Sequence, residues 1–173
     1  AGRPLGTNYI NFFDRSYTYP VYLSREATTT ALVQAGAGNW NGQRVPWNPS
    51  WTIPGGTDQQ IIILDEATGV EYNAWQVSYS PSLNRLTASR FSRVTANFDE
   101  TGGPGDYRTK IDGFRPSRGC GVQYLAMLIT PEEIEQGKIY HAVSCVMGRS
   151  GHKFFTRPAY KGERFDGNQH DQG

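Results

Sequence analysis

Apolar and polar positions alternate along much of the chain, a pattern typical of β-strands rather than helices. The clearest example is "QIIILDEATGVEYNAWQVSY", which predicts strands at residues 60–64 and 70–79, joined by a turn around "DEATG". A four-residue turn would place Leu64 opposite Glu71. The segment is therefore predicted to be a β-hairpin.

Further short strands are predicted from β-branched and aromatic residues at 17–23, 86–88, 94–98, 124–129, 138–147 and 153–156. Two stretches rich in Gly, Pro and Asn, residues 35–56 and 99–121, are expected to be long loops. Short strands separated by turns favour a mainly β fold, specifically an antiparallel β-sandwich or jelly roll formed by one domain over residues 1–173.

One short helix is predicted at about residues 130–137. Thr130 is a suitable N-cap, Pro131 fits the first helical position, and Glu133 completes a capping box. Gly137 supplies the left-handed stop. Because the helix is barely two turns long and has no full amphipathic face, it is expected to connect two strands.

Composition narrows the class of protein. The 173 residues are 37% hydrophobic and only 19% charged, with 20 Gly, 10 Pro and 10 Tyr, which suits an extracellular β-protein. A net charge of +1 with scattered basic residues argues against nucleic acid as a partner. No apolar run is long enough for a membrane-spanning helix.

The cysteines and histidines give no metal motif, so neither a metal nor a cofactor is expected. Cys120 and Cys145 allow one disulfide or two free thiols. An extracellular composition with an even cysteine count favours the disulfide.

The second strand of the hairpin carries the candidate chemistry. Glu71, Asn73 and Trp75 alternate with apolar residues and so share one face. An indole can stack on a sugar ring while an acid and an amide bond its hydroxyls. Substrate binding is therefore assigned to Asn73, Trp75 and Asp58, and to the loop residues Trp40, Trp47 and Trp51. An ordinary solvated face is the alternative.

Catalysis would require a second group. Asp58 is six residues from Leu64, about 20 Å along the strand, whereas glycoside hydrolysis needs carboxyls about 5–9.5 Å apart. Asp99, at the end of "VTANFD", is the preferred partner for Glu71. His141 is either a core histidine or a proton donor or acceptor, as a polysaccharide lyase would need.

Several segments together resemble a family of secreted bacterial β-proteins without an assigned activity. They are "NWNGQRVPWN", "TDQQIIILDEATGVEYNAWQV", "ANFDETG", "LAMLITPEEIEQGKIYHAVSCVM" and "FTRPAYKGERFDG", between residues 39 and 167. In that family a "DxH…YE" hairpin, an "FDL" strand and a "GLxxxxEIxxGxIxHAL" segment follow in this order. The family's recurrent positions correspond here to Asp58, Glu71, Asp99, Glu133, Gly137 and His141.

This sequence departs from the family pattern in three places. Gln60 stands where the family tends to have His, and "FRPSRGCGVQY" replaces a small-residue loop. The family also continues with a "GxPMGxRxxL" strand, whereas this sequence ends at "HDQG". The resemblance therefore implies missing C-terminal strands, and the polar end is expected to run toward a second polypeptide that carries them.

Three functions are compatible with these features. The leading hypothesis is an extracellular enzyme acting on a polysaccharide or oligosaccharide in a Trp-lined groove, either a glycoside hydrolase using Glu71 and Asp99 or a lyase using His141 and a tyrosine. The second is a carbohydrate-binding module without chemistry. The third is a structural or adhesive domain of a virion tail or surface assembly.

Overall fold

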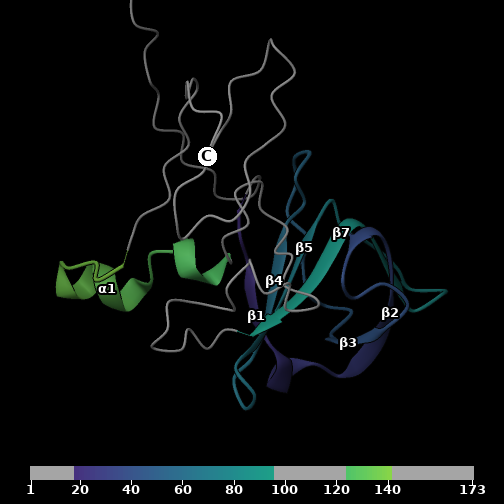
Figure 1. Ribbon diagram of the computed structural model, residues 1–173, viewed down its shortest axis with the longest axis horizontal. Helices are drawn as coiled ribbons and strands as arrows, with labels where there is room; N and C mark the ends of the chain where they lie inside the picture. The colour runs from purple at the N-terminus through teal and green to yellow at the C-terminus, as the bar shows by residue number, and fades with distance from the viewer. Residues whose placement is uncertain (1–17, 96–123, 142–173) are drawn as a thin grey trace, which may run out of the picture.

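The computed structural model describes residues 18–95 and 124–141, which form one curled sheet with short helical segments (Figure 1). The strands are β1 (Val21–Leu23), β2 (Thr29–Gly38), β3 (Arg44–Trp47), β4 (Ile61–Asp65), β5 (Val70–Trp75), β6 (Ser78–Ser80) and β7 (Arg85–Thr95). The helical segments are the 3-10 turns η1 (Ser24–Glu26) and η3 (Leu125–Met127) and the helix α1 (Pro131–Gln136). The prediction of a mainly β protein is confirmed.

The sheet is mixed, in the order β1-β4-β5-β7-β2-β3, with β6 paired to the first residues of β7. β1 pairs parallel to β4 and β2 parallel to β7, while the other pairs are antiparallel. The expectation of an antiparallel arrangement throughout is wrong for these two pairs. Strand patterns report which residues are buried, but they do not report which distant strand becomes the neighbour.

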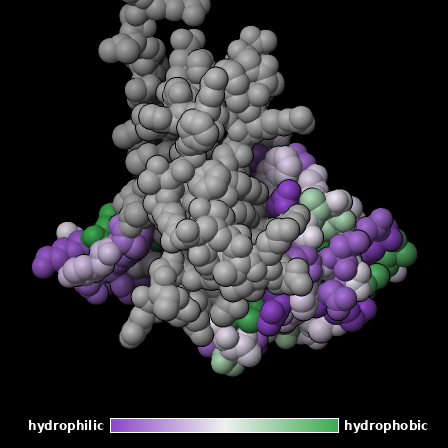
Figure 2. Space-filling view, in the orientation of Figure 1, coloured by the Kyte–Doolittle hydropathy of each residue, from purple (hydrophilic) through white to green (hydrophobic). Residues whose placement is uncertain are grey.

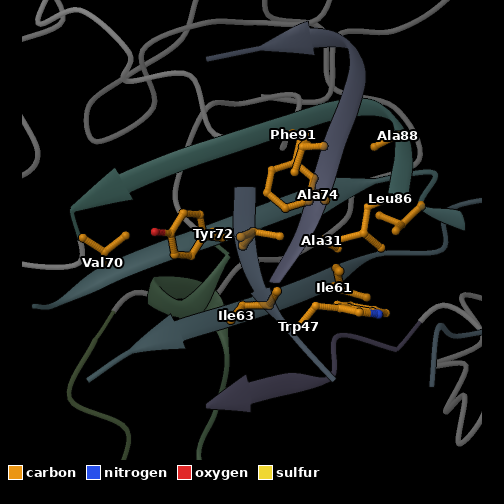
Figure 3. Close-up of a cluster of buried hydrophobic side chains, with 13 residues drawn as sticks. Ala31, Trp47, Ile61, Ile63, Val70, Tyr72, Ala74, Leu86, Ala88 and Phe91 are labelled. Carbon is orange, nitrogen blue, oxygen red and sulfur yellow. The ribbon is translucent and has the colours of Figure 1, made fainter. Parts of the chain in front are cut away.

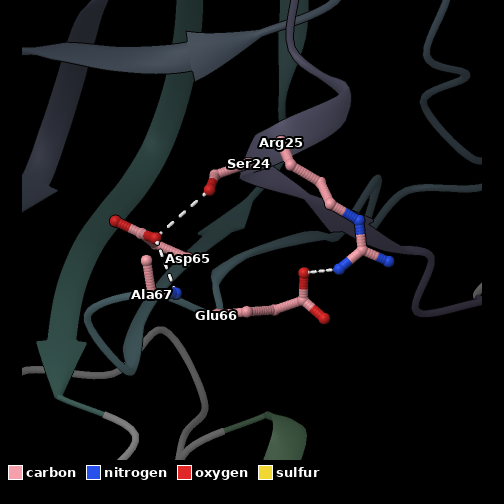
Figure 4. A network of polar contacts seen from close by, with 5 residues as sticks. All are labelled: Ser24, Arg25, Asp65, Glu66 and Ala67. Atoms are coloured by element: carbon pink, nitrogen blue, oxygen red, sulfur yellow. Dashed lines mark hydrogen bonds and ion pairs between the residues drawn. The ribbon is translucent and has the colours of Figure 1, made fainter.

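The predicted hairpin is confirmed as β4 and β5, and Leu64 lies opposite Glu71 as expected. Its turn is fixed by Asp65, whose carboxylate accepts hydrogen bonds from Ser24 and Ala67 (Figure 4) and from Thr68. The second strand stops at Trp75 because Gln76 has a positive φ of 55°. The chain bends there, and β6 continues along β7.

Other predicted elements need correction. Residues 86–88 and 94–95 belong to one long strand, β7, and the predicted strand at 124–129 is instead the turn η3. Residues 138–141 form no strand. The predicted loop at 35–56 contains the end of β2 and all of β3. Glycines misled the prediction there: a Cβ on Gly38 would collide with the Phe91 backbone, and one on Gly36 would lie 3.3 Å from the Ser89 carbonyl oxygen.

The predicted helix is confirmed with its caps. Thr130 accepts a hydrogen bond from the Glu133 backbone, the Glu133 carboxylate accepts one from the Thr130 backbone, and Gly137 is left-handed. No residue of α1 is buried. Its geometry is therefore specified locally rather than by packing. No helix among the described residues is long and apolar enough to cross a membrane.

The inner face of the curled sheet holds the apolar core (Figure 3). This face is formed by Ala31, Val33, Val45, Trp47, Ile61, Ile63, Val70, Tyr72, Ala74, Val77, Leu86, Ala88 and Phe91. Trp51 joins the two edges of the sheet, because its ring stacks on Tyr22 of β1 at 4.6 Å and meets Trp47 of β3 edge-on at 5.3 Å. The opposite side is called the outer face below.

Candidate functional site

The outer face is divided into a covered half and an open half. The covered half consists of residues from β4, β5 and β7 that are buried although they point away from the core: Ile62, Glu71, Asn73, Ser92 and Val94. The open half consists of exposed residues from β2, β3, β6 and β7: Leu32, Gln34, Arg44, Ser78, Thr87 and Ser89, with the partly exposed Arg85 and Arg90. Trp75 lies at the border between them.

The Glu71 carboxylate is the centre of the covered half. Its Oε1 accepts hydrogen bonds from the Asn73 amide at 2.9 Å and the Tyr124 backbone N–H at 3.2 Å. Its Oε2 accepts one from the Leu125 backbone N–H at 3.3 Å. Glu71 and Tyr124 both have 0% exposure. Glu71 therefore binds a segment more than 50 residues further along the chain to the sheet.

Burial raises the pKa of Glu71 above its ordinary value of 4.5, because desolvation penalises the charged form. The hydrogen bonds from Asn73, Leu125 and Tyr124 act in the opposite direction but are the smaller effect. A raised pKa is a property that general acids share. Here the carboxyl group is enclosed by its own chain.

The predicted row of Glu71, Asn73 and Trp75 does share one face, but its members differ in exposure. Glu71 and Asn73 are fully buried, so this part of the face is not solvated, and only Trp75 reaches the surface. The hairpin sequence does not contain the signal for this difference. It comes from Tyr124 and Leu125, which lie over Glu71.

Trp75 and Asp58 are brought together at the border. The indole Nε1 donates a hydrogen bond to Asp58 Oδ1 at 3.3 Å, and the Gln76 N–H donates to the Asp58 carbonyl oxygen at 2.8 Å. Gln60 immediately precedes β4. It is only 4% exposed, and its Oε1 has no hydrogen-bond partner. An indole and a carboxylate thus meet at one place.

The other three tryptophans belong to the inner face and do not join Trp75. Trp47 is buried in the core, and Trp51 lies between it and Tyr22. Trp40 donates from Nε1 to the Arg44 carbonyl oxygen at 3.0 Å. The Arg93 guanidinium lies 5.3 Å from the Trp40 ring centroid. The proposed substrate contacts at Trp40, Trp47 and Trp51 are therefore separated from Trp75 by the thickness of the sheet.

His141 lies beside α1. Its Nε2 is 3.2 Å from Glu133 Oε2, the same oxygen that accepts the Thr130 N–H at 3.0 Å. The Thr130 hydrogen bond, with a contribution from His141, lowers the pKa of Glu133. Since residues 138–141 are not a strand, His141 is not the expected histidine of a central strand. Asp99, Cys120 and Cys145 lie outside the described residues, so Asp99 as a partner of Glu71 and the disulfide both stay predictions.

The open half contains the residues that the sequence analysis missed. Between residues 27 and 57, and again between 72 and 98, there is no acidic residue, although these segments supply Arg44, Arg85 and Arg90. The surface around the sheet is mainly hydrophilic in the view of Figure 2, with small hydrophobic spots. The absence of acidic residues from these two segments was the available signal in the sequence. It becomes informative once β2, β3, β6 and β7 are known to be neighbours.

Among residues 18–95 and 124–141, no three His, Cys, Asp or Glu side chains gather as a metal site would require. No protein family, curated protein or solved structure significantly matches this chain. The resemblance to a secreted bacterial family therefore stays a prediction.

Proposed function

We propose that the protein binds a polysaccharide on the outer face of its sheet, with Trp75 as the stacking platform, and that it does so outside the cell. The observation that carries the proposal is the half-exposed Trp75 indole held by Asp58 through Nε1. A tryptophan anchored at its polar edge can offer its ring face to the C–H groups of a sugar.

The groups around Trp75 suit sugar hydroxyls. Asp58 uses Oδ1 for the indole, which leaves Oδ2 as an acceptor. Thr87 and Ser89 add exposed hydroxyl groups along β7. Because Asp58 fixes the indole before a ligand arrives, little side-chain entropy is lost on binding.

Binding without hydrolysis is favoured by the separation of the two acids. Glu71 precedes Trp75 by four residues on β5, about 13 Å along the strand. Asp58, at the Trp75 end, is thus further from Glu71 than the roughly 5–9.5 Å that paired catalytic carboxyls require. Among the described residues, Trp75 has one acid beside it rather than a pair.

Hydrolysis is the second candidate, and the raised pKa of Glu71 is the observation that favours it. In this case Glu71 would be the proton donor and Asp99 its partner, and the segment at Tyr124 and Leu125 would have to move away to admit a sugar. Reducing-end assays with the Glu71→Gln variant test this candidate. Product formation by the wild type and none by the variant would support it.

The test of the binding proposal is affinity electrophoresis against a panel of soluble polysaccharides, comparing the wild type with Trp75→Ala. The expected loss is about tenfold or more in affinity, as for other stacked aromatic contacts. Trp40→Phe is the matched control, since Trp40 is also half-buried but belongs to the inner face. If the polysaccharide slowed the migration of Trp75→Ala as much as that of the wild type, the proposal would be rejected.

A further inference from the structure

The charges of the described sheet are segregated. The acids Glu26, Asp58, Asp65, Glu66 and Glu71 all lie on or beside η1, β4 and β5. Four of the five arginines, Arg44, Arg85, Arg90 and Arg93, lie on β3 and β7. The fifth, Arg25, is paired with Glu66 on the acidic side (Figure 4).

Three of these arginines are placed on the open half by strand register. Leu32 of β2 is the partner of Arg44 on one side and of Arg85 on the other, so the two arginines lie on either side of one exposed apolar residue. Arg90 is the partner of Trp75 across β5 and β7. Arg85 and Arg90 are five residues apart on one strand, about 16 Å.

The side chains between the arginines are small, polar and uncharged. Thr87 is the partner of both Gln34 and Ser78, and all three are exposed. Ser89 follows, with its hydroxyl bonded to Gln76. A strip of hydroxyls and amides therefore runs along β7 from Arg85 to Arg90, the partner of Trp75.

The arginines of this strip are not neutralised within the described sheet. No ion pair with an acid is formed by Arg44, Arg85 or Arg90 among the described residues, whereas Arg25 has Glu66. The Nε of Arg85 is buried and has no hydrogen-bond partner. Arg44 donates to the Thr30 hydroxyl and carbonyl, which orients its guanidinium without cancelling the charge.

We infer that the polysaccharide recognised by the open half is anionic, a chain of sugars bearing carboxylate or sulfate groups, read by Arg85 and Arg90 on either side of the Thr87 and Ser89 hydroxyls. The inference rests on the proposed function, whose ligand class it narrows. Guanidinium groups bind carboxylates and sulfates through paired, charge-assisted hydrogen bonds. Hydroxyls spaced between them suit a ligand that alternates hydroxyls with charges.

A polysaccharide is favoured over nucleic acid by the number and spacing of the cations. The strip has two arginines on one strand and a third on β3, and the whole protein has a net charge of +1. Binding to a phosphate backbone draws on many closely spaced Lys and Arg contacts. A polymer with fewer charges than nucleic acid fits this strip better.

The test uses polygalacturonate and its fully methyl-esterified form, which share one backbone and differ in charge, together with alginate, chondroitin sulfate, a neutral glucan and duplex DNA. The wild type is compared with Arg85→Gln/Arg90→Gln, which keeps polar side chains of similar reach. Arg25→Gln is the matched control, because Arg25 is exposed on the acidic side. Circular dichroism confirms that each variant is folded.

At least one acidic polysaccharide is expected to bind the wild type more tightly than its neutral counterpart does. The double variant should weaken that binding about tenfold, and raising the salt to about 0.5 M should weaken it as well. Arg25→Gln should leave it unchanged.

Other outcomes separate the two claims. In one such outcome, acidic and neutral polysaccharides bind the wild type equally, and binding is lost in Trp75→Ala. That result would support the proposed function but contradict the inference that the ligand is anionic. DNA binding as tight as that of any polysaccharide at the same salt would also overturn it. If no polysaccharide binds at all, the proposed function itself fails.

Discussion

The covered and open halves of the outer face meet on β7 and at the end of β5, but they differ in exposure to solvent. On β7, Ser92 is fully buried while Ser89, three residues earlier, is exposed. On β5, Glu71 is enclosed by its own chain, whereas Trp75 at the end of the strand reaches the surface. The alternation along β7 shifts by one residue between the halves, because Ala88 and Phe91 are three residues apart and both belong to the inner face.

The difference arises from a distant segment. Tyr124 and Leu125 return to Glu71 and donate their N–H groups to its two oxygens, and so that half becomes a second, polar core. No described segment lies in this way over Thr87 and Ser89. A polar residue on a strand can therefore be structural or functional, and what lies over it decides which.

The largest expected effect comes from adding the same charge to each half. Ser92→Lys places an ammonium group where the native residue has 0% exposure, whereas Ser89→Lys places it in water. We expect Ser92→Lys to lower the free energy of unfolding by about 4 kcal/mol or to prevent folding. Ser89→Lys should change it by less than about 0.5 kcal/mol. Urea denaturation measures both, and similar values for the two variants would contradict the division of the face.

The next effect concerns the Glu71 carboxylate. Glu71→Ala leaves the backbone N–H groups of Tyr124 and Leu125 and the amide of Asn73 without their acceptor. The expected cost is about 3 kcal/mol of unfolding free energy, with faster hydrogen exchange at those two backbone amides. Thr87→Ala is the control from the open half. An unchanged exchange rate at Tyr124 and Leu125 would show that Glu71 does not hold the segment.

A smaller effect is expected in the pH dependence of stability. Because the pKa of Glu71 is raised in the folded state, the folded protein binds this proton more readily than the unfolded chain does. The stabilising contribution of the protonated Glu71 should therefore be fully present below the unfolded pKa of about 4.5 and be lost as the pH rises through the folded pKa.

The measurement is the difference in unfolding free energy between the wild type and Glu71→Gln across this range. The free energy of unfolding of the wild type should rise relative to that of Glu71→Gln as the pH falls from neutral toward the unfolded pKa. A difference that stays constant, or that changes in the opposite direction, would show that burial does not control this carboxyl group.

Local signals made part of this structure predictable. The β4–β5 register followed from apolar alternation and turn length, and the caps of α1 followed from Thr130, Glu133 and Gly137, because each depends on residues close in sequence. The parallel β2–β7 pair did not follow. The glycines that suggested a loop are needed because β2 lies close to the Phe91 and Ser89 backbone of β7.

The candidate site was predictable to a similar extent. Asp58 and Trp75 were both selected from the sequence, although only the structure shows their hydrogen bond. Glu71 was selected as an acid on a strand, but its role depends on Tyr124 and Leu125, which no pattern in the hairpin indicates. Arg85 and Arg90 were missed, because their importance depends on which strands are neighbours.

The division between a covered and an open half is tested most directly by a map of backbone and indole N–H chemical shifts during titration with an acidic polysaccharide oligomer selected by the binding panel. We predict that the changes concentrate at the Trp75 indole and at Thr87, Ser89 and Arg90, in the open half. The amides of Asn73, Ser92 and Tyr124 should stay unchanged. Changes centred on Glu71, Asn73 and Tyr124 instead would place the ligand in the covered half and contradict the central claim.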